Sequence, residues 1–298
     1  MNSLGGARVV GEINPTLRRR KLAAELRRLR EEAGLHGVQV ARSLRWSTSK
    51  ISRLETGQVA PSAKDVARLL KHYGVDDELS GLLLELAQGE NKGWWDAYAD
   101  VFADAVVELF GLEDGASRVR AWGSFSLPGL LQTRDYAEQM GSLARIVEMA
   151  PPGKIERRTR ARLRRQRVLL KDPPLDYSVV LDEAVLRRRF GSADAKLMSD
   201  QMSHLMKMSD MPNVSIRVLP LEQSHPTDIA NFILLSFPAM PVLGDISREA
   251  VYFENHPVFT LSEDEETVLQ YSLVFDGLLS QALSEEGSRA FIASLAGL

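Results

Sequence analysis

Residues 36–57, HGVQVARSLRWSTSKISRLETG, decide the fold of the first part of this chain. Apolar residues recur with a 3.6-residue period on either side of a break, at Val40, Leu44, Ile51 and Leu54. This spacing predicts two short helices joined by a tight turn. Small Ala41 falls where the two helices should cross, which lets their backbones approach closely. The stretch is typical of a helix-turn-helix.

The second of these helices has the chemistry needed next to DNA. Ser47 stands at the N-cap position, and the outward side chains that follow are short hydroxyls and long cations, with no acid before Glu55. We predict DNA base contacts from Thr48, Ser49, Ser52 and Arg53. We predict phosphate contacts from Gln39, Arg45 and Lys50. Two alternatives stay open: Ser52 only caps or is solvated, or Arg53 pairs with Glu55 or with an acid of the first helix.

Composition limits the classes of protein to consider. The chain has 298 residues with 44% hydrophobic content, enough for a sizeable core and two domains. It has no cysteine, which excludes disulfides, thiolate metal sites and cysteine nucleophiles. Its N-terminus lacks the apolar run of a signal peptide, and no stretch approaches membrane-spanning length. We therefore expect a cytoplasmic, nucleoid-associated protein without membrane contact.

The net charge of −3 hides two halves of opposite sign. Residues 1–74 hold 15 Lys and Arg against 6 Asp and Glu, a net charge of +9, and the remainder holds 22 against 34, a net charge of −12. A basic module joined to an acidic one suits a reader of nucleic acid attached to a domain that does not bind phosphate. Solvated helix faces are the alternative explanation.

Four regions are expected along the chain: a flexible arm at 1–16, an all-helical DNA-binding domain at 17–90, a helical connector at 91–114, and an α/β or α+β domain at 115–298. In the second region, Ser62 and Asp65 predict a capping box at the start of a fourth helix. In the last region, strands are predicted at 176–181, 213–220, 231–237 and, less clearly, 249–254. Helices are predicted at 151–171, 183–190, 194–209 and 263–283.

Residues 17–74 resemble the lambda-repressor-like family of helix-turn-helix domains, also called the Cro/cI or xenobiotic-response-element family, and SKISRLETG is the usual end of its recognition helix. One departure is Arg45, which stands in the turn where this family often has glycine. That position often takes a left-handed backbone, which arginine adopts only with strain.

The chain as a whole resembles actinobacterial regulators, described as Scr1-type and antitoxin-like, in which this module precedes a domain of unknown function. The likeness rests on WGSFSLPGLLQTRDYA (122–137), RARLRRQRVLL (160–170), LDEAVLRRRFG (181–191) and SIRVLP with HPTDIANFILLSFP (215–238). Such regulators are often encoded beside a small protein of another family. The resemblance therefore implies a small protein partner.

No catalytic motif is found in the sequence. The five histidines are scattered, and no phosphate loop or GxSxG elbow occurs, so we expect no enzyme, no metal and no cofactor. Asp182 and Glu183 follow a predicted strand, where acids more often begin a helix than form a catalytic pair. Candidate ligand or partner residues are His225, Asp228, Asn231, Arg160 and Arg164. For the arginine-rich helix that holds the last two, we favour intramolecular or partner ion pairs over DNA contact.

The sequence thus predicts a regulator that binds a double-stranded DNA operator, dimerises through its second domain and senses a protein partner or a small ligand there. One rival hypothesis is an antitoxin-like protein that neutralises a small partner and regulates its own synthesis. The other is an unrecognised enzyme in the second domain.

Overall fold

The computed structural model divides into two compact units. The described residues are 14–89, 92–148, 151–190, 195–238, 249–255 and 258–297. The first unit reaches Asp96 and the second begins at Ala97. The expected flexible arm lies outside the described residues up to position 13.

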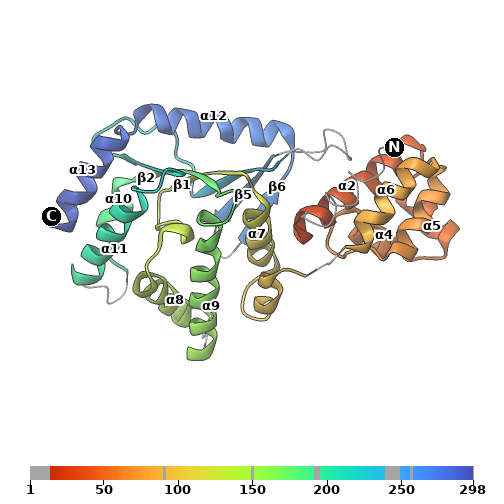
Figure 1. Cartoon of the computed structure of the whole chain (residues 1–298), viewed down its shortest axis with the longest axis horizontal. Coiled ribbons are helices and arrows are strands. Elements are labelled where there is room, and N and C mark those ends of the chain that lie inside the picture. Colours follow the sequence, from red (N-terminus) through yellow and green to blue (C-terminus); the bar gives the residue numbers. More distant parts are fainter. Residues whose placement is uncertain are drawn as a thin grey trace. The chain divides into compact units, whose positions relative to one another are not determined.

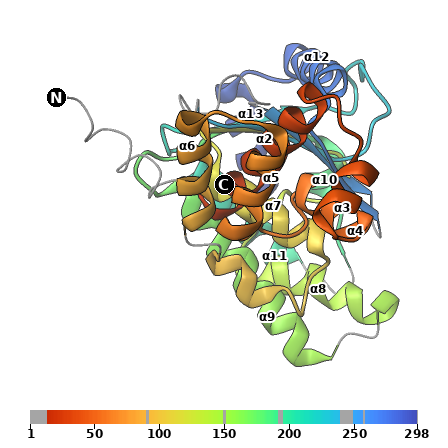
Figure 2. The same cartoon turned by 90° about the vertical axis from the view of Figure 1, so that its right-hand side faces the viewer.

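The described residues of the first unit form five α-helices around one apolar core. They are α2 (Pro15–Glu32), α3 (Gly37–Leu44), α4 (Thr48–Glu55), α5 (Ala63–Tyr73) and α6 (Asp77–Gln88). Four begin at a side-chain cap, because Asn14, Ser47, Ser62 and Asp76 each accept a bond from a backbone N–H of the first turn. The shared core includes Leu26, Val40, Ile51, Val66, Leu70 and Leu83. Figure 2 shows α3 and α4 side by side in this unit.

The segment expected as a connector is divided between the two units. Residues 94–98 form a short 3-10 helix across the boundary. Helix α7 (Asp104–Gly115) lies inside the second unit and contacts its last strand. The second unit therefore starts before residue 115, the expected boundary.

The second unit contains a mixed six-stranded sheet. The strands are β1 (Arg118–Gly123), β2 (Asp176–Asp182), β3 (Val214–Leu219), β4 (Phe232–Ser236), β5 (Glu249–Asn255) and β6 (Val258–Ser262). Their order is β3-β2-β1-β4-β5-β6, with β1, β2 and β3 parallel to one another and the other neighbours antiparallel. Because β1, β2 and β3 run in the same direction, the loops that follow them gather at one edge of the sheet. Strand β4, beside β1, runs in the opposite direction.

Helices cover both faces of this sheet (Figure 1). One face carries α12 (Glu265–Gln281), whose Val268, Phe275 and Leu278 pack on Trp122 and Phe232. The other helices are α8 (Arg134–Glu148), α9 (Pro152–Arg165), α10 (Glu183–Arg187), α11 (Ala195–Met208) and α13 (Glu285–Ala296). Helices α7, α8 and α9 lie on the opposite face from α12 (Figure 1). The prediction of an all-helical domain followed by an α+β domain is confirmed.

Candidate nucleic-acid interface

The packing of α3 against α4 follows the sequence pattern. Val40, Ala41, Ile51 and Leu54 are all at most 2% exposed, and Leu44 packs at the edge of the same core. Ala41 is therefore in the close crossing that its size predicted. Burial of these residues fixes one face of α4 inward and leaves the opposite face for contacts with other molecules.

The turn between the two helices has the geometry expected from the family pattern. Arg45 takes a left-handed conformation, with φ 57° and ψ 44°. Ser47 Oγ then accepts a bond of 3.1 Å from Lys50 N and caps α4. Trp46 lies just before this cap and packs at the edge of the core, while Lys50 Nζ lies 3.8 Å from its ring centroid. The turn is thus held by a cap and a cation–π contact despite its strained arginine.

The four residues predicted to contact bases are brought together on α4. Thr48, Ser49, Ser52 and Arg53 are all exposed. The Arg53 guanidinium makes a long bond of 3.4 Å from Nε to Ser49 O of its own helix. Its two terminal amino groups remain available in a planar fork, the shape that pairs with a guanine edge.

The residues predicted to contact phosphates have different surroundings. Arg45 is exposed, as is Gln39. Gln39 Oε1 accepts a bond of 2.7 Å from His36 N and so helps to cap α3. Lys50 Nζ bonds to Asp65 Oδ1 at 2.9 Å, so this cation is neutralised within the unit. The Asp65 carboxylate, predicted to close a capping box, binds Lys50, while its backbone N–H bonds to Ser62 Oγ.

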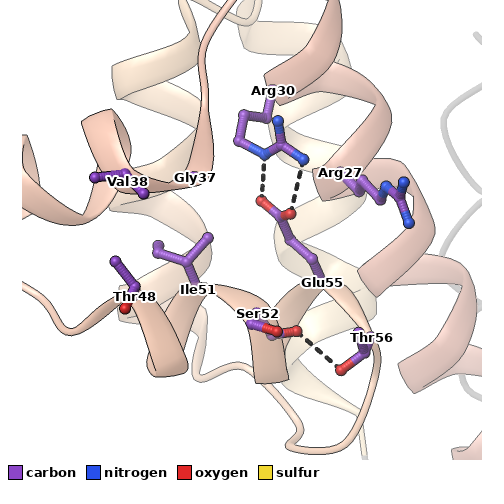
Figure 3. Close-up of a pocket in the computed structure, with 9 residues that line it drawn as sticks. All are labelled: Arg27, Arg30, Gly37, Val38, Thr48, Ile51, Ser52, Glu55 and Thr56. Atoms are coloured by element: carbon purple, nitrogen blue, oxygen red, sulfur yellow. Dashed lines mark hydrogen bonds and ion pairs between the residues drawn. The ribbon is translucent and has the colours of Figure 1, made fainter.

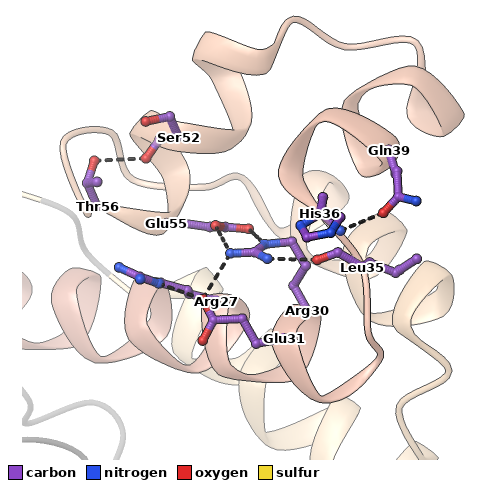
Figure 4. Close-up of polar contacts among 9 residues, drawn as sticks. All are labelled: Arg27, Arg30, Glu31, Leu35, His36, Gln39, Ser52, Glu55 and Thr56. Carbon is purple, nitrogen blue, oxygen red and sulfur yellow. Dashed lines mark hydrogen bonds and ion pairs between the residues drawn. The ribbon is translucent and has the colours of Figure 1, made fainter.

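An ion pair that sequence reasoning missed braces α4. Arg30 on α2 donates to both carboxylate oxygens of Glu55, at 2.8 and 3.0 Å, and to Leu35 O at 2.8 Å (Figure 4). The two side chains are only 12% and 9% exposed, and the hydrogen bond that Arg30 donates to Glu55 raises the pKa of Arg30. One guanidinium thus links the first helix, the following loop and the end of α4. Acidic Glu55 is therefore occupied by Arg30 and does not pair with Arg53.

A pocket of about 320 Å³ lies beside this brace (Figure 3). Its walls come from α2, the start of α3 and the outer face of α4, and its lining residues are Arg27, Arg30, Gly37, Val38, Thr48, Ile51, Ser52, Glu55 and Thr56. Two of the predicted base-contacting residues, Thr48 and Ser52, therefore line one wall, and Val38, which is 67% exposed, lines another. The sequence alone gave no signal for this hollow, because it depends on how three helices pack.

The candidate residues of the second unit do not form one cluster of free groups. His225 Nε2 lies 3.0 Å from Asp182 Oδ2, and Asp182 also caps α10 through Ala184 N. Asn231 Oδ1 accepts bonds from the backbone N–H groups of Ser124 and Phe125 and so holds the loop after β1. Asp228 is exposed in the same loop as His225. His225 and Asn231 thus fasten loops at the edge where the parallel strands end.

The arginine-rich helix α9 makes ion pairs within its own unit. Arg165 pairs with Glu113 on α7, where both side chains are buried. Arg157 pairs with exposed Asp100, and Arg160 is 3.4 Å from Glu156. Arg164 is exposed. These contacts agree with the preference for ion pairs over DNA contact.

Two kinds of site are absent from the described ranges. These ranges contain no group of three or more His, Asp or Glu side chains placed to hold a metal ion. None of their helices combines the length and the apolar character that crossing a membrane requires.

Two family descriptions match the chain. A helix-turn-helix domain matches residues 21–83, and the domain of unknown function DUF5753 matches residues 106–294. No curated protein and no solved structure matches the chain. The first match agrees with the geometry of α3 and α4, and a domain of this kind indicates a DNA-binding regulator. The second covers the sheet and helices α8 to α12, with most of α7 and α13.

Proposed function

The chain belongs to the DUF5753 family, and we propose that it is a sequence-specific transcriptional regulator acting at the nucleoid in the cytoplasm. In this proposal the first unit reads a double-stranded operator. The second unit has no catalytic role, holds no cofactor, dimerises, and receives a signal from a small partner protein or ligand, as in the antitoxin-like regulators that the sequence resembles.

One observation carries the proposal: the outer face of α4 presents Thr48, Ser49, Ser52 and Arg53 to solvent on a helix whose opposite face is buried. Arg53 is suited to donate two bonds to a guanine, and the Thr48 methyl is suited to meet a thymine methyl. Because Arg30 holds the carboxylate of Glu55, the one acid of α4 does not compete for Arg53.

Phosphate contacts position such a helix on the duplex. The amide nitrogen of Gln39 and the guanidinium of Arg45 are the donors that we assign to this role, since both side chains are exposed beside α4. Lys50 must leave Asp65 before it binds a phosphate. We therefore rank it below Gln39 and Arg45, although all three were expected to contribute.

The test is selection of binding sequences from a random duplex pool with the full chain, followed by competition against unselected DNA. We expect one sequence to outcompete the pool, and Arg53→Ala to reduce that preference by roughly 10-fold, the discrimination expected from a bidentate contact. Arg160→Ala removes the same charge from the second unit and serves as the matched control. If no sequence outcompetes random DNA, or if Arg53→Ala changes nothing, the proposal fails.

The signal-receiving role is supported by the loops at the ends of the parallel strands, where open α/β sheets commonly bind ligands. His225 with Asp182 and Asn231 with Ser124 tie these loops to β1 and β2. Purification of the native chain with its bound molecules tests this role. Recovery of a stoichiometric small protein that releases the operator supports it, and a chain that carries neither partner nor ligand and ignores both on DNA opposes it.

A further inference from the structure

Helix α12 has one buried face and one exposed face. Its inner face packs on the sheet through Val268, Phe275 and Leu278, all at most 6% exposed. Its outer face carries Leu269 and Leu273, which are 61% and 64% exposed. These leucines are four residues apart, so they lie one turn apart on the same side of the helix. Figure 1 shows α12 stretched along the face of the sheet opposite α7, α8 and α9.

This leucine pair differs from the other exposed apolar side chains. Among the described residues the large ones are Val38, Val59, Phe125, Leu170, Leu221, Leu269 and Leu273. The first two belong to the DNA-binding unit, and the next three stand on separate loops or turns of the second unit. Leu269 and Leu273 alone in this set occupy successive turns of one helix. Apolar side chains grouped in this way mark a surface for association.

We propose that this outer face of α12 is where two copies of the chain associate, with the two α12 helices antiparallel across a two-fold axis. The charges of α12 favour the antiparallel over the parallel orientation of such a pair. The helix contains no Lys or Arg, and Glu265 and Glu266 stand together in its first turn. Parallel helices would bring four glutamates together. Antiparallel helices place the two glutamates of each copy beside the last turn of the other helix, which ends in Ser280 and Gln281. Antiparallel helix dipoles also attract each other.

The position of the leucines fits a two-fold axis close to Leu273, the middle residue of the helix. Such an axis brings Leu273 against its own counterpart. It places Leu269 of one copy beside Gly277 of the other, where the absence of a side chain leaves room. Pro226 packs next to Gly277, 3.7 Å from where a Cβ would stand, and is itself exposed. The association surface is therefore Leu269, Leu273 and Pro226, with Gly277 between them.

The nearest acid on this face is already neutralised. Asp276 lies 3.5 Å from Arg120 of β1, whose guanidinium also bonds to Ser272 at 2.9 Å. In this register Gln270 of the second copy faces the aspartate, and Glu266 faces Ser280 one turn further along. The ends of the antiparallel pair are therefore polar and its centre is apolar, as expected of an interface with a dry core and a wet rim.

This inference rests on the proposed function in one respect, because a single helix-turn-helix makes few base contacts and commonly works as one of two copies on paired half-sites. The association itself is measured without DNA, so the two ideas can fail separately.

Disulfide trapping is a direct test, since the chain has no cysteine. Leu273→Cys, oxidised with diamide in the otherwise unaltered chain, is expected to give a covalent dimer of twice the 33.1 kDa mass of one chain. Leu170→Cys is the matched control, because Leu170 is 77% exposed but stands on another element of the same unit. Equal trapping of both variants, or trapping of neither, overturns the proposal.

Sedimentation equilibrium without DNA supplies the second test. The double variant Leu269→Glu with Leu273→Glu adds charge to exposed positions, so it should fold, and its circular dichroism checks this. We expect its dimer dissociation constant to rise roughly 100-fold. A wild-type monomer at all concentrations, or a double variant that dimerises like wild type, overturns the proposal. If the double variant is monomeric but still prefers the selected DNA sequence, the DNA-reading proposal is unaffected. If the wild type dimerises but shows no sequence preference, the DNA-reading proposal fails and the association proposal stands.

Discussion

Helix α4 carries two cations in eight residues, whereas α9 carries seven in fourteen. A count of charge alone would choose α9 as the DNA-binding helix. The fold brings acids from neighbouring elements to α9, namely Glu113 from α7 and Asp100 from the loop before it. On α4 the two cations differ: Asp65 pairs with Lys50, whereas Arg30 occupies Glu55 and leaves Arg53 facing solvent. Cations therefore indicate a nucleic-acid interface only where the fold leaves them without acids.

The largest expected effect comes from breaking the buried pair of α9. Arg165→Ala leaves the Glu113 carboxylate without its partner in a fully buried position, and removing one member of such a pair typically costs about 3–5 kcal/mol. We expect this loss in the unfolding transition of the second unit, followed by urea denaturation of the full chain. Arg160→Ala on the same helix is the control and should change stability by less than about 0.5 kcal/mol, since its side chain is 62% exposed. A loss below about 1 kcal/mol in Arg165→Ala would mean that α9 does not depend on its acids.

The contrast between the two helices also separates what sequence reasoning reached from what it missed. Patterns within a short stretch were enough for α3, α4, the Ser47 cap and the left-handed position of Arg45. The strands β2 to β5 have apolar runs and were found as well. The sequence RVRAWG of β1 was missed because arginines alternate with its buried residues, and the short strand β6 and the helix α13 gave too little signal.

Contacts between distant elements were beyond reach for a different reason. The bond from Arg30 to Glu55 spans 25 positions and that from Lys50 to Asp65 spans 15, so neither leaves a local pattern. The sequence analysis did name Glu55 as a member of an ion pair, but with Arg53 as its partner and not Arg30. Which arginine reaches that acid depends on how α2 crosses α4. Lys50 can contact a phosphate only after its bond to Asp65 breaks.

The next effect tests the Arg30–Glu55 ion pair, which keeps Glu55 away from Arg53. Glu55→Gln replaces a charged acceptor that is only 9% exposed, and we expect a loss of about 2 kcal/mol in the stability of the first unit. Affinity for the selected DNA sequence should fall too, because α4 loses its link to α2. Glu31→Gln is the matched control, since Glu31 also contacts Arg30 but is 52% exposed. Equal stability losses in the two variants would show that burial of the Arg30–Glu55 pair has no special role.

A smaller effect should follow from releasing Lys50. Asp65→Asn removes the acid that neutralises this lysine. Both side chains of the pair are partly buried, and we expect a stability loss of about 1 kcal/mol. We expect DNA affinity to rise by up to roughly 5-fold, and the slope of log affinity against log salt to steepen by about one phosphate contact. Asp77→Asn on α6 removes the same charge from an exposed position and controls for the overall change. If both variants have the same salt slope, Lys50 does not reach phosphate even when it is released.

The smallest effect concerns the pH dependence of stability and the imidazole of His204, which, unlike the arginines of α4 and α9, changes charge near neutral pH. Burial, together with the nearby Lys207, lowers the pKa of His204 on α11 below its ordinary value of 6.5. The unfolded chain then binds a proton that the folded chain refuses, so stability is full above about pH 6.5 and declines as the pH falls toward the lower folded pKa. One such group gives a slope of at most about 1.4 kcal/mol per pH unit. We expect the unfolding free energy of the second unit to fall less between pH 7 and pH 5.5 in His204→Gln than in wild type, and identical curves would show that His204 does not contribute to the acid sensitivity of this unit.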